Sequence, residues 1–245
     1  MTQDCHYKQD GGKEGIARSI SQLCTYPFET RKTKIQVGLR NPRIINCYRG
    51  AVQSSFTSGF VFASYFTIYN SLHPNPLASS IASFITSFIK IPIANCMRVL
   101  QINEHHRHFI ESGSIIVKKR GLRGLYSGYG ISVIEDIIET NIRDYLYEKS
   151  KNIVQMPIPA IRMVTGSFAG AIGASITTPF DTIRANLAHN TLKVGRNDIF
   201  GTTKALILSQ EGPKALFRGV HLRAASNAIR YALFYLVMEY LYLIR

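Results

Sequence analysis

The sequence of 245 residues has no tryptophan, four cysteines and few acidic residues, since 15 Asp and Glu stand against 29 Lys and Arg. The cysteines form no C-x-x-C pair and are too sparse for a disulfide scaffold, which favours a reducing compartment. Asp, Glu, Lys and Arg are all missing from Gly50 to Ile89, over 40 residues, and again from Met163 to Phe180. Because a membrane-spanning helix takes about 20 residues, the first of these stretches holds most of two spans.

Catalytic motifs are missing as well. No Walker loop, no dinucleotide-binding G-x-G-x-x-G after a strand and no nucleophile elbow occurs in the chain. The one cluster of metal-ligating residue types, at 104–108, lies in a basic loop and has no partner cluster that would complete a tetrahedral site. We therefore predict no enzyme, no cofactor and no metal site.

An internal repeat is the strongest positive signal. Three short segments resemble one another: PFETRK at 27–32, PIANCM at 92–97 and PFDTIR at 179–184. Each is followed by an aromatic residue two positions before a glycine, and 22 residues further on lie Asn70, Glu148 and Glu239. The distance from the proline of the first motif to the aromatic residue of the second varies from 21 to 38 residues. Constant helices joined by variable loops would produce this pattern.

These segments resemble the signature of the mitochondrial carrier family, P-x-[D/E]-x-x-[K/R] followed by [D/E]-G-x-x-x-x-aromatic-[K/R]-G, in three copies. The resemblance covers nearly the whole chain. It implies an all-α membrane protein with six transmembrane helices, arranged as three pseudosymmetric helical hairpins around a central cavity. The implied helices are 13–35, 50–72, 77–100, 129–151, 161–187 and 219–244, and the implied repeats are 1–75, 76–155 and 156–245.

The charge of the predicted loops agrees with this arrangement. The long loops carry net charges of +6 at 31–50, +4 at 98–128 and +4 at 184–219, whereas the short turns at 73–77 and 147–160 carry 0 and +1. Positive charge thus gathers on one side of the membrane. Nucleic-acid binding is disfavoured, because the basic residues are spread over three loops with no aromatic-basic module between them.

The resemblance also implies partners and a location. A member of this family is a multi-pass monomer of the mitochondrial inner membrane that binds a small-molecule solute. Basic loops beside the membrane further predict contacts with anionic, cardiolipin-like lipid head groups.

Two gates are implied by the family pattern. The matrix gate comprises Glu29, Lys32, Asp181 and Arg184, with Gln36 and Gln101 as supporting glutamines. The second copy has the uncharged Ala94 and Met97 at its signature positions, so that only the pair of Lys32 with Asp181 is complete, with Arg98 as a substitute for Met97. The gate on the opposite side is predicted at Asn70, Glu148, Lys151 and Glu239.

Solute contacts are implied on the even-numbered helices. The predicted residues are Thr57, Ser58, Glu135, Asp136, Glu139, Arg143, Ser226, Asn227 and Arg230, with Gln22 on the first helix. Glu135, Glu139 and Arg143 are four residues apart, which places them on one helix face. Carboxylates mixed with guanidinium groups suit a solute that carries both charges.

The run GLYSGYG at 124–130 resembles S-adenosylmethionine carriers, so the expected solute is S-adenosylmethionine or another mixed-charge molecule, and the expected mode of transport is exchange. A nucleotide or deoxynucleotide carrier is one alternative. Because the signature charges at Ala94 and Met97 are absent, a membrane scaffold that no longer transports is an alternative of a different class.

Overall fold

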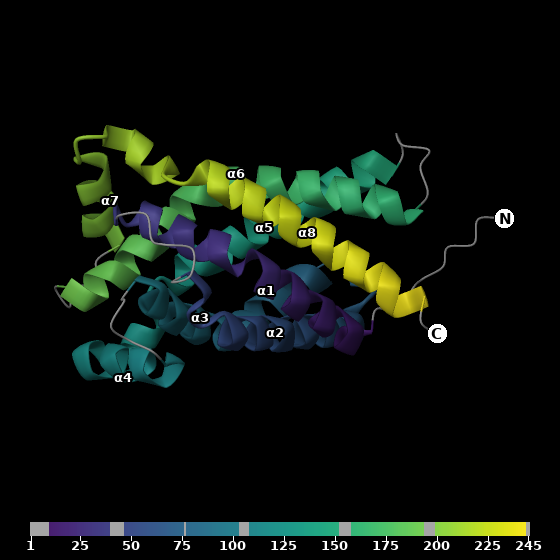
Figure 1. Ribbon diagram of the computed structural model, residues 1–245, viewed down its shortest axis with the longest axis horizontal. Helices are drawn as coiled ribbons and strands as arrows, with labels where there is room; N and C mark the ends of the chain where they lie inside the picture. Colours follow the sequence, from purple (N-terminus) through teal and green to yellow (C-terminus); the bar gives the residue numbers. More distant parts are fainter. Residues whose placement is uncertain are drawn as a thin grey trace.

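The computed structural model describes residues 10–39, 47–75, 77–102, 108–151, 158–193 and 199–243. Within these ranges, the side chains of 158–162, 191–193, Arg143, Asp144, Tyr147, Glu148, Ser150 and Lys151 are not described. The regular elements of the described part are all helices (Figure 1). The six long ones are α1 (Gly11–Gln36), α2 (Ala51–Leu72), α3 (Ala78–Ile102), α5 (Tyr129–Lys151), α6 (Ile158–Lys193) and α8 (Val220–Leu243).

The six helices predicted from the sequence agree with these bounds to within six residues. The largest difference is in α6, which continues to Lys193 because no proline or glycine follows Phe180 before Gly195. Two shorter helices in the long loops were not predicted, α4 (Phe109–Arg120) and α7 (Ile199–Ile207). In α4, only Ser112 and Ile116, four residues apart, are buried, which is a weak helical signal.

The long helices close into a ring. Each packs against the next in chain order, and α8 packs back against α1. The Lys13 ammonium at the start of α1 donates to the Leu241 carbonyl near the end of α8, at 3.1 Å. We call this end of the ring the turn end. The helices α4 and α7 lie at the opposite end, the loop end (Figure 1).

Three helices carry the signature prolines inside them. Pro27 in α1, Pro92 in α3 and Pro179 in α6 all lie in the half of the helix nearer its C-terminus. An internal proline costs a helix in water about 3 kcal/mol, but neighbouring helices in a membrane bundle can satisfy the freed backbone groups. The three helices converge here, because α1, α3 and α6 also contact one another.

The glycine of the aromatic-x-glycine motif has the same backbone conformation in each of the three copies. Gly50, Gly128 and Gly219 have φ values of +80°, +73° and +74°. They immediately precede the first residues of α2, α5 and α8, the second transmembrane helix of each pair. A side chain strongly disfavours this left-handed conformation, which explains why the motif ends in glycine. The repeat seen in the sequence is therefore also a repeat of backbone geometry.

Small residues allow close helix packing at two contacts of the ring. A Cβ atom on Gly59 of α2 would lie 2.6 Å from the Gly15 carbonyl oxygen of α1. On the other side, Gly170 of α6 lies against the ring of Tyr231 of α8. Such contacts let backbones approach where no side chain separates them.

The ring is polar inside and apolar outside. Among the described residues, 28 polar or charged side chains are buried against 23 apolar ones, whereas large apolar groups such as Val52, Phe56 and Phe168 are exposed. This distribution suits a bundle that faces lipid. By hydropathy alone, α3 is the only described helix that qualifies as a membrane span, because the polar inner faces lower the mean of the others.

Candidate functional site

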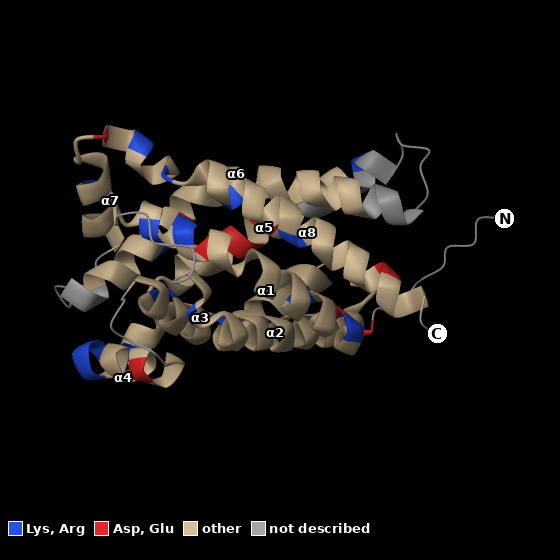
Figure 2. Ribbon diagram, viewed as in Figure 1, with Lys and Arg blue, Asp and Glu red and all other residues tan. Residues whose placement is uncertain are grey.

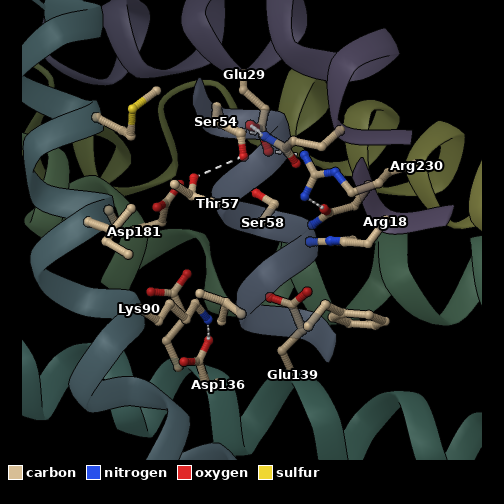
Figure 3. A pocket seen from close by; sticks show the side chains of 18 of the residues that line it. Arg18, Glu29, Ser54, Thr57, Ser58, Lys90, Asp136, Glu139, Asp181 and Arg230 are labelled. Atoms are coloured by element: carbon tan, nitrogen blue, oxygen red, sulfur yellow. Dashed lines mark hydrogen bonds and ion pairs between the residues drawn. The ribbon is translucent and has the colours of Figure 1, made fainter. Parts of the chain in front are cut away.

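A cavity of about 330 Å³ lies inside the ring and is lined by all six long helices (Figure 3). Its volume is at the small end of the range of about 300–1,000 Å³ that is typical of small-molecule sites. The structure brings nine of the ten predicted solute-binding residues to this cavity: Gln22, Thr57, Ser58, Glu135, Asp136, Glu139, Ser226, Asn227 and Arg230. The tenth, Arg143, has its side chain outside the described part of the chain.

The cavity contains charges of both signs. Figure 2 shows acidic and basic residues together in the middle of the bundle. The described lining has five acidic side chains, Glu29, Glu135, Asp136, Glu139 and Asp181, and seven basic ones, Arg18, Lys32, Lys90, Arg98, Arg184, Arg223 and Arg230. Intramembrane charges are costly and are therefore usually functional.

Asp181 on α6 is the centre of an ion-pair network. Its carboxylate accepts from Lys32 of α1 at 2.8 Å and from Arg98 of α3 at 2.6 Å, and it lies 2.9 Å from Arg223 of α8. Gln36 donates to the same carboxylate at 3.0 Å. One buried acidic group thus joins four helices, and its negative charge is met by three cations.

Glu135 on α5 extends this network. Its two oxygens accept from Arg184 of α6 at 2.7 Å and from Arg223 at 2.6 Å. Arg223 also donates to the Thr177 hydroxyl at 2.9 Å. Since Arg223 contacts both Glu135 and Asp181, the network is continuous across α1, α3, α5, α6 and α8.

A separate ion pair joins α1 to α8. Arg230 of α8 donates to one carboxylate oxygen of Glu29, and Gln22 donates to the other. Arg230 is further held by Asn227 at 3.0 Å and by the Thr25 hydroxyl at 3.3 Å. The predicted solute residues Gln22, Asn227 and Arg230 therefore form one hydrogen-bonded group.

Glu139 is the least engaged carboxylate of the cavity. Its only ion pair with a described residue is a 3.4 Å contact to Arg223, which already binds Glu135 and Asp181 at shorter distances. Its side chain is 22% exposed. Asp136, by contrast, is paired with Lys90 of α3 at 2.5 Å.

The α2 side of the cavity is uncharged. Ser54, Thr57 and Ser58 line it, and the Thr57 hydroxyl donates to backbone carbonyls of its own helix. Beyond them lie Phe62 and Tyr65, and the Arg18 guanidinium of α1 lies over the Phe62 ring, 5.2 Å from its centroid. The charged side chains that line the cavity therefore all come from the five other long helices.

The comparison with known proteins identifies the family. A model described as mitochondrial carrier protein matches residues 70–158 and 157–244, which is well over half of the chain. The chain belongs to the mitochondrial carrier family. As a mitochondrial carrier, it is a multi-pass, all-helical protein of the mitochondrial inner membrane.

Several relatives carry the name mitochondrial glycine transporter. The one from Aspergillus niger is 26% identical over 274 aligned residues, which cover 91% of this chain and 86% of the relative. Those from Emericella nidulans and Ajellomyces capsulatus are 25% and 24% identical, and the alignments cover 91% and 94% of this chain and 84% and 86% of the relatives.

The positions predicted for the carrier's matrix gate lie where the prolines bring three helices together. The structure contains the pair of Lys32 with Asp181, and Gln36 donates to it. Arg98 pairs with Asp181 rather than with Glu29, so the substitution expected for Met97 is wrong. Gln101 accepts from the Thr33 hydroxyl at 3.1 Å instead of contacting an ion pair.

The predicted opposite gate lies at the turn end of this carrier. Asn70 and Glu239 are exposed, and Glu239 makes no ion pair with any residue that the structure describes. The side chains of Glu148 and Lys151 lie outside the described part. The role of these four residues stays a prediction, as does the division into repeats at 75/76 and 155/156.

Two important residues of the site are not among those predicted to contact the solute or to form a gate. Arg223 lies four and seven residues before Asn227 and Arg230, so the helical spacing places it on their face, but it does not indicate the pairing with Asp181 and Glu135. Lys90 is the first charged residue after the long uncharged stretch, but nothing in the sequence indicates its pairing with Asp136.

A signature ion pair also lies outside the membrane-spanning helices, at the loop end. Arg218 donates to Glu211 at 2.6 Å, and this hydrogen bond lowers the pKa of Glu211 and raises the pKa of Arg218. Its stabilisation is present above the unfolded-state pKa of Glu211 and is lost as the pH falls through the lowered value. Because Glu211 is exposed, water screens the pair.

A metal centre is not indicated in the described part of this carrier, where no group of three or more His, Cys, Asp or Glu residues could hold an ion. Of the cluster at 104–108, only His108 lies within the described residues.

Proposed function

We propose that this carrier moves a small mixed-charge solute of the amino-acid class across the inner membrane by alternating access. The observation that carries the proposal is that Glu139 of α5 and Arg230 of α8 both line one cavity, together with Arg18 of α1 (Figure 3). A solute with an ammonium group and a carboxylate would find an opposite charge for each.

Glu139 suits the cationic end of such a solute. The other described carboxylates of the cavity have close basic partners, whereas Glu139 shares an already occupied arginine at 3.4 Å. A cation bound at Glu139 would gain a charge-assisted hydrogen bond without first breaking a short one. The anionic end would be met by Arg230, with Arg18 as the second basic group on that side.

The names of the relatives support a small amino acid. Glycine carries both charges in the least volume, and the small cavity accommodates it more easily than a larger mixed-charge solute. S-adenosylmethionine, the solute suggested by the run at 124–130, remains in the panel of solutes to be tested. Nucleotides are disfavoured, because a polyphosphate needs clustered bases, and six of the seven bases lining this cavity already pair with its carboxylates.

The ion pairs at the loop end would act as the matrix gate. They lie near the convergence of α1, α3 and α6, their residues line the cavity, and opening that side would require them to separate. A scaffold that no longer transports would have no need of a complete buried network. The pairing of Glu29 with Arg230, and of Arg184 with Glu135, therefore argues against this alternative. Exchange, the monomeric state and contacts with anionic lipid stay predictions.

The test is solute uptake into liposomes that contain the purified protein. The panel comprises glycine and other amino acids, S-adenosylmethionine, keto acids, ribonucleotides and deoxynucleotides. We expect uptake of a small mixed-charge solute and none of nucleotides. Glu139→Gln should reduce this uptake about tenfold or more, since a hydrogen bond to a charged group contributes about 1.5–3 kcal/mol.

The matched control is Glu211→Gln, the same chemical change outside the cavity, which should transport at the wild-type rate. Uptake of nucleotides alone would contradict the proposed solute class. A folded protein that moves no member of the panel would favour the scaffold, and wild-type uptake by Glu139→Gln would remove Glu139 from the binding site.

A further inference from the structure

The second repeat leaves two signature charges of the gate without their expected partners. Ala94 stands where the family pattern has the carboxylate that would pair with Arg184. Met97 stands where it has the base that would pair with Glu29. Both orphaned charges are buried or nearly so, and a buried charge without a partner is strongly destabilising.

In the structure, both charges are paired by residues from other helices. Arg184 binds Glu135 of α5 at 2.7 Å, and Glu29 binds Arg230 of α8. The two replacements have opposite signs, and each has the sign of the charge that the second repeat lacks. Both lie at positions predicted to contact the solute, and both line the cavity.

The replacement pair at Arg184 is specific. Among the described residues, Glu135 is the only acidic partner of Arg184, and the Arg184 Nε atom is buried without a hydrogen-bond partner. The side chains of Arg184 and Glu135 are 5% and 6% exposed. Loss of the Glu135 carboxylate would therefore leave a buried guanidinium group unpaired.

We infer that Glu135 and Arg230 complete the matrix gate in place of the charges missing at Ala94 and Met97, so that solute binding and gate closure compete for the same two side chains. This inference rests on the proposed transport function. The carboxylate of a solute competes with Glu29 for Arg230. Its cationic group, bound at Glu139 one helical turn from Glu135, competes with Arg184 for the Glu135 carboxylate. A solute of one charge can weaken one pair only, and a mixed-charge solute weakens both.

This arrangement makes a difference to specificity. In a gate closed by its own signature pairs, solute contacts and gate contacts are separate side chains. Here the solute must carry both charges to release both pairs, because a ligand shifts a conformational equilibrium only through its differential affinity for the two states. Singly charged analogues should therefore bind without being moved.

The test restores the missing carboxylate. Ala94 lines the cavity one helical turn before Arg98, so Ala94→Glu places an acidic group at the signature position. Three proteins are compared with the wild type: Glu135→Gln, Glu135→Gln with Ala94→Glu, and Glu135→Gln with Ala94→Gln. The readouts are the thermal unfolding temperature of the solubilised protein, which needs no solute, and uptake into liposomes.

We expect Glu135→Gln to lower the unfolding temperature by several degrees and the uptake about tenfold or more. Ala94→Glu should restore the unfolding temperature and part of the uptake, whereas Ala94→Gln, which adds similar bulk without charge, should restore neither. Should Glu135→Gln not fold alone, its recovery as folded protein by Ala94→Glu, and not by Ala94→Gln, is the same expected result.

A charge exchange tests the second pair. Glu29→Arg and Arg230→Glu should each lower the unfolding temperature, and their combination should recover most of the loss. Failure of both Ala94→Glu and the charge exchange to raise the unfolding temperature would overturn the inference, even if the wild type transports. Absence of uptake by the wild type would instead contradict the proposed function, and the thermal result would still decide the pairing.

Discussion

The two ends of the ring differ in how their charged residues are used. At the loop end, Asp181, Glu135 and Arg223 belong to a buried network that joins five of the six long helices. At the turn end, Asn70 and Glu239 are exposed, and Glu239 pairs with no described residue. Among the described residues, the buried ion pairs are thus concentrated toward the end of the ring that carries α4 and α7.

If the loop-end network is the gate of the proposed transport cycle, its stability and its role in conformational change can be considered separately. A buried ion pair contributes little net stability relative to an apolar pair, but breaking it by removal of one partner is strongly destabilising. The loop-end layer can therefore set which conformation is populated without making the fold excessively stable. The comparison predicts that equal chemical changes at the two ends have very unequal effects.

The largest effect is expected for Arg223→Gln. Arg223 is buried and contacts Glu135, Glu139 and Asp181, so its loss removes a cation shared by three carboxylates and takes from Glu139 its only ion pair with a described residue. We expect a loss of about 3–5 kcal/mol in the free energy of unfolding, measured by thermal or denaturant unfolding of the solubilised protein. An unfolding temperature equal to that of the wild type would contradict the network.

A smaller effect is expected for Lys32→Gln. Asp181 retains Arg98, Arg223 and Gln36 when the Lys32 ammonium is removed. Since no carboxylate is left unpaired, we expect a loss of about 1–3 kcal/mol, together with altered uptake because the matrix side closes less firmly. A stability loss as large as that of Arg223→Gln would show that the Lys32 pair, and not the Arg223 bridge, holds the network together.

The smallest effect on stability is expected for Glu239→Gln at the turn end. Its side chain is exposed and makes no described ion pair, so the unfolding temperature should stay at the wild-type value. Uptake should nevertheless slow if Glu239 forms the opposite gate when the cavity changes sides. A clear loss of thermal stability would mean that the turn end is also closed by ion pairs in this state.

The sequence is sufficient to predict the long helices and the inner face of each. The proline motif lies where three helices converge, and the aromatic-x-glycine motif provides a left-handed glycine just before a helix begins. These structural requirements keep the positions of both motifs constant relative to the helices. Both Glu135 and Glu139 line the cavity, as their spacing of four residues indicates. The short helices α4 and α7 were missed because each buries only two side chains.

The partners across the cavity could not be predicted in the same way. Register along a helix shows that Glu135 points inward, but not whether its carboxylate reaches Arg184 of another helix. That depends on the distance and rotation between helices, which a single sequence does not contain. For this reason the prediction that Arg98 replaces Met97 as the partner of Glu29 was wrong, and Arg98 pairs with Asp181 instead.

Closure of the ring by α8 against α1 also has a consequence for biogenesis. The first and last long helices close the ring through contacts such as that of Lys13 with Leu241. The inner wall is therefore enclosed only after the final hairpin has entered the bilayer. Before that moment, the arginines and carboxylates of the wall face hydrocarbon or a half-formed groove. An intermediate with two hairpins would therefore expose to lipid the charges that the finished protein buries.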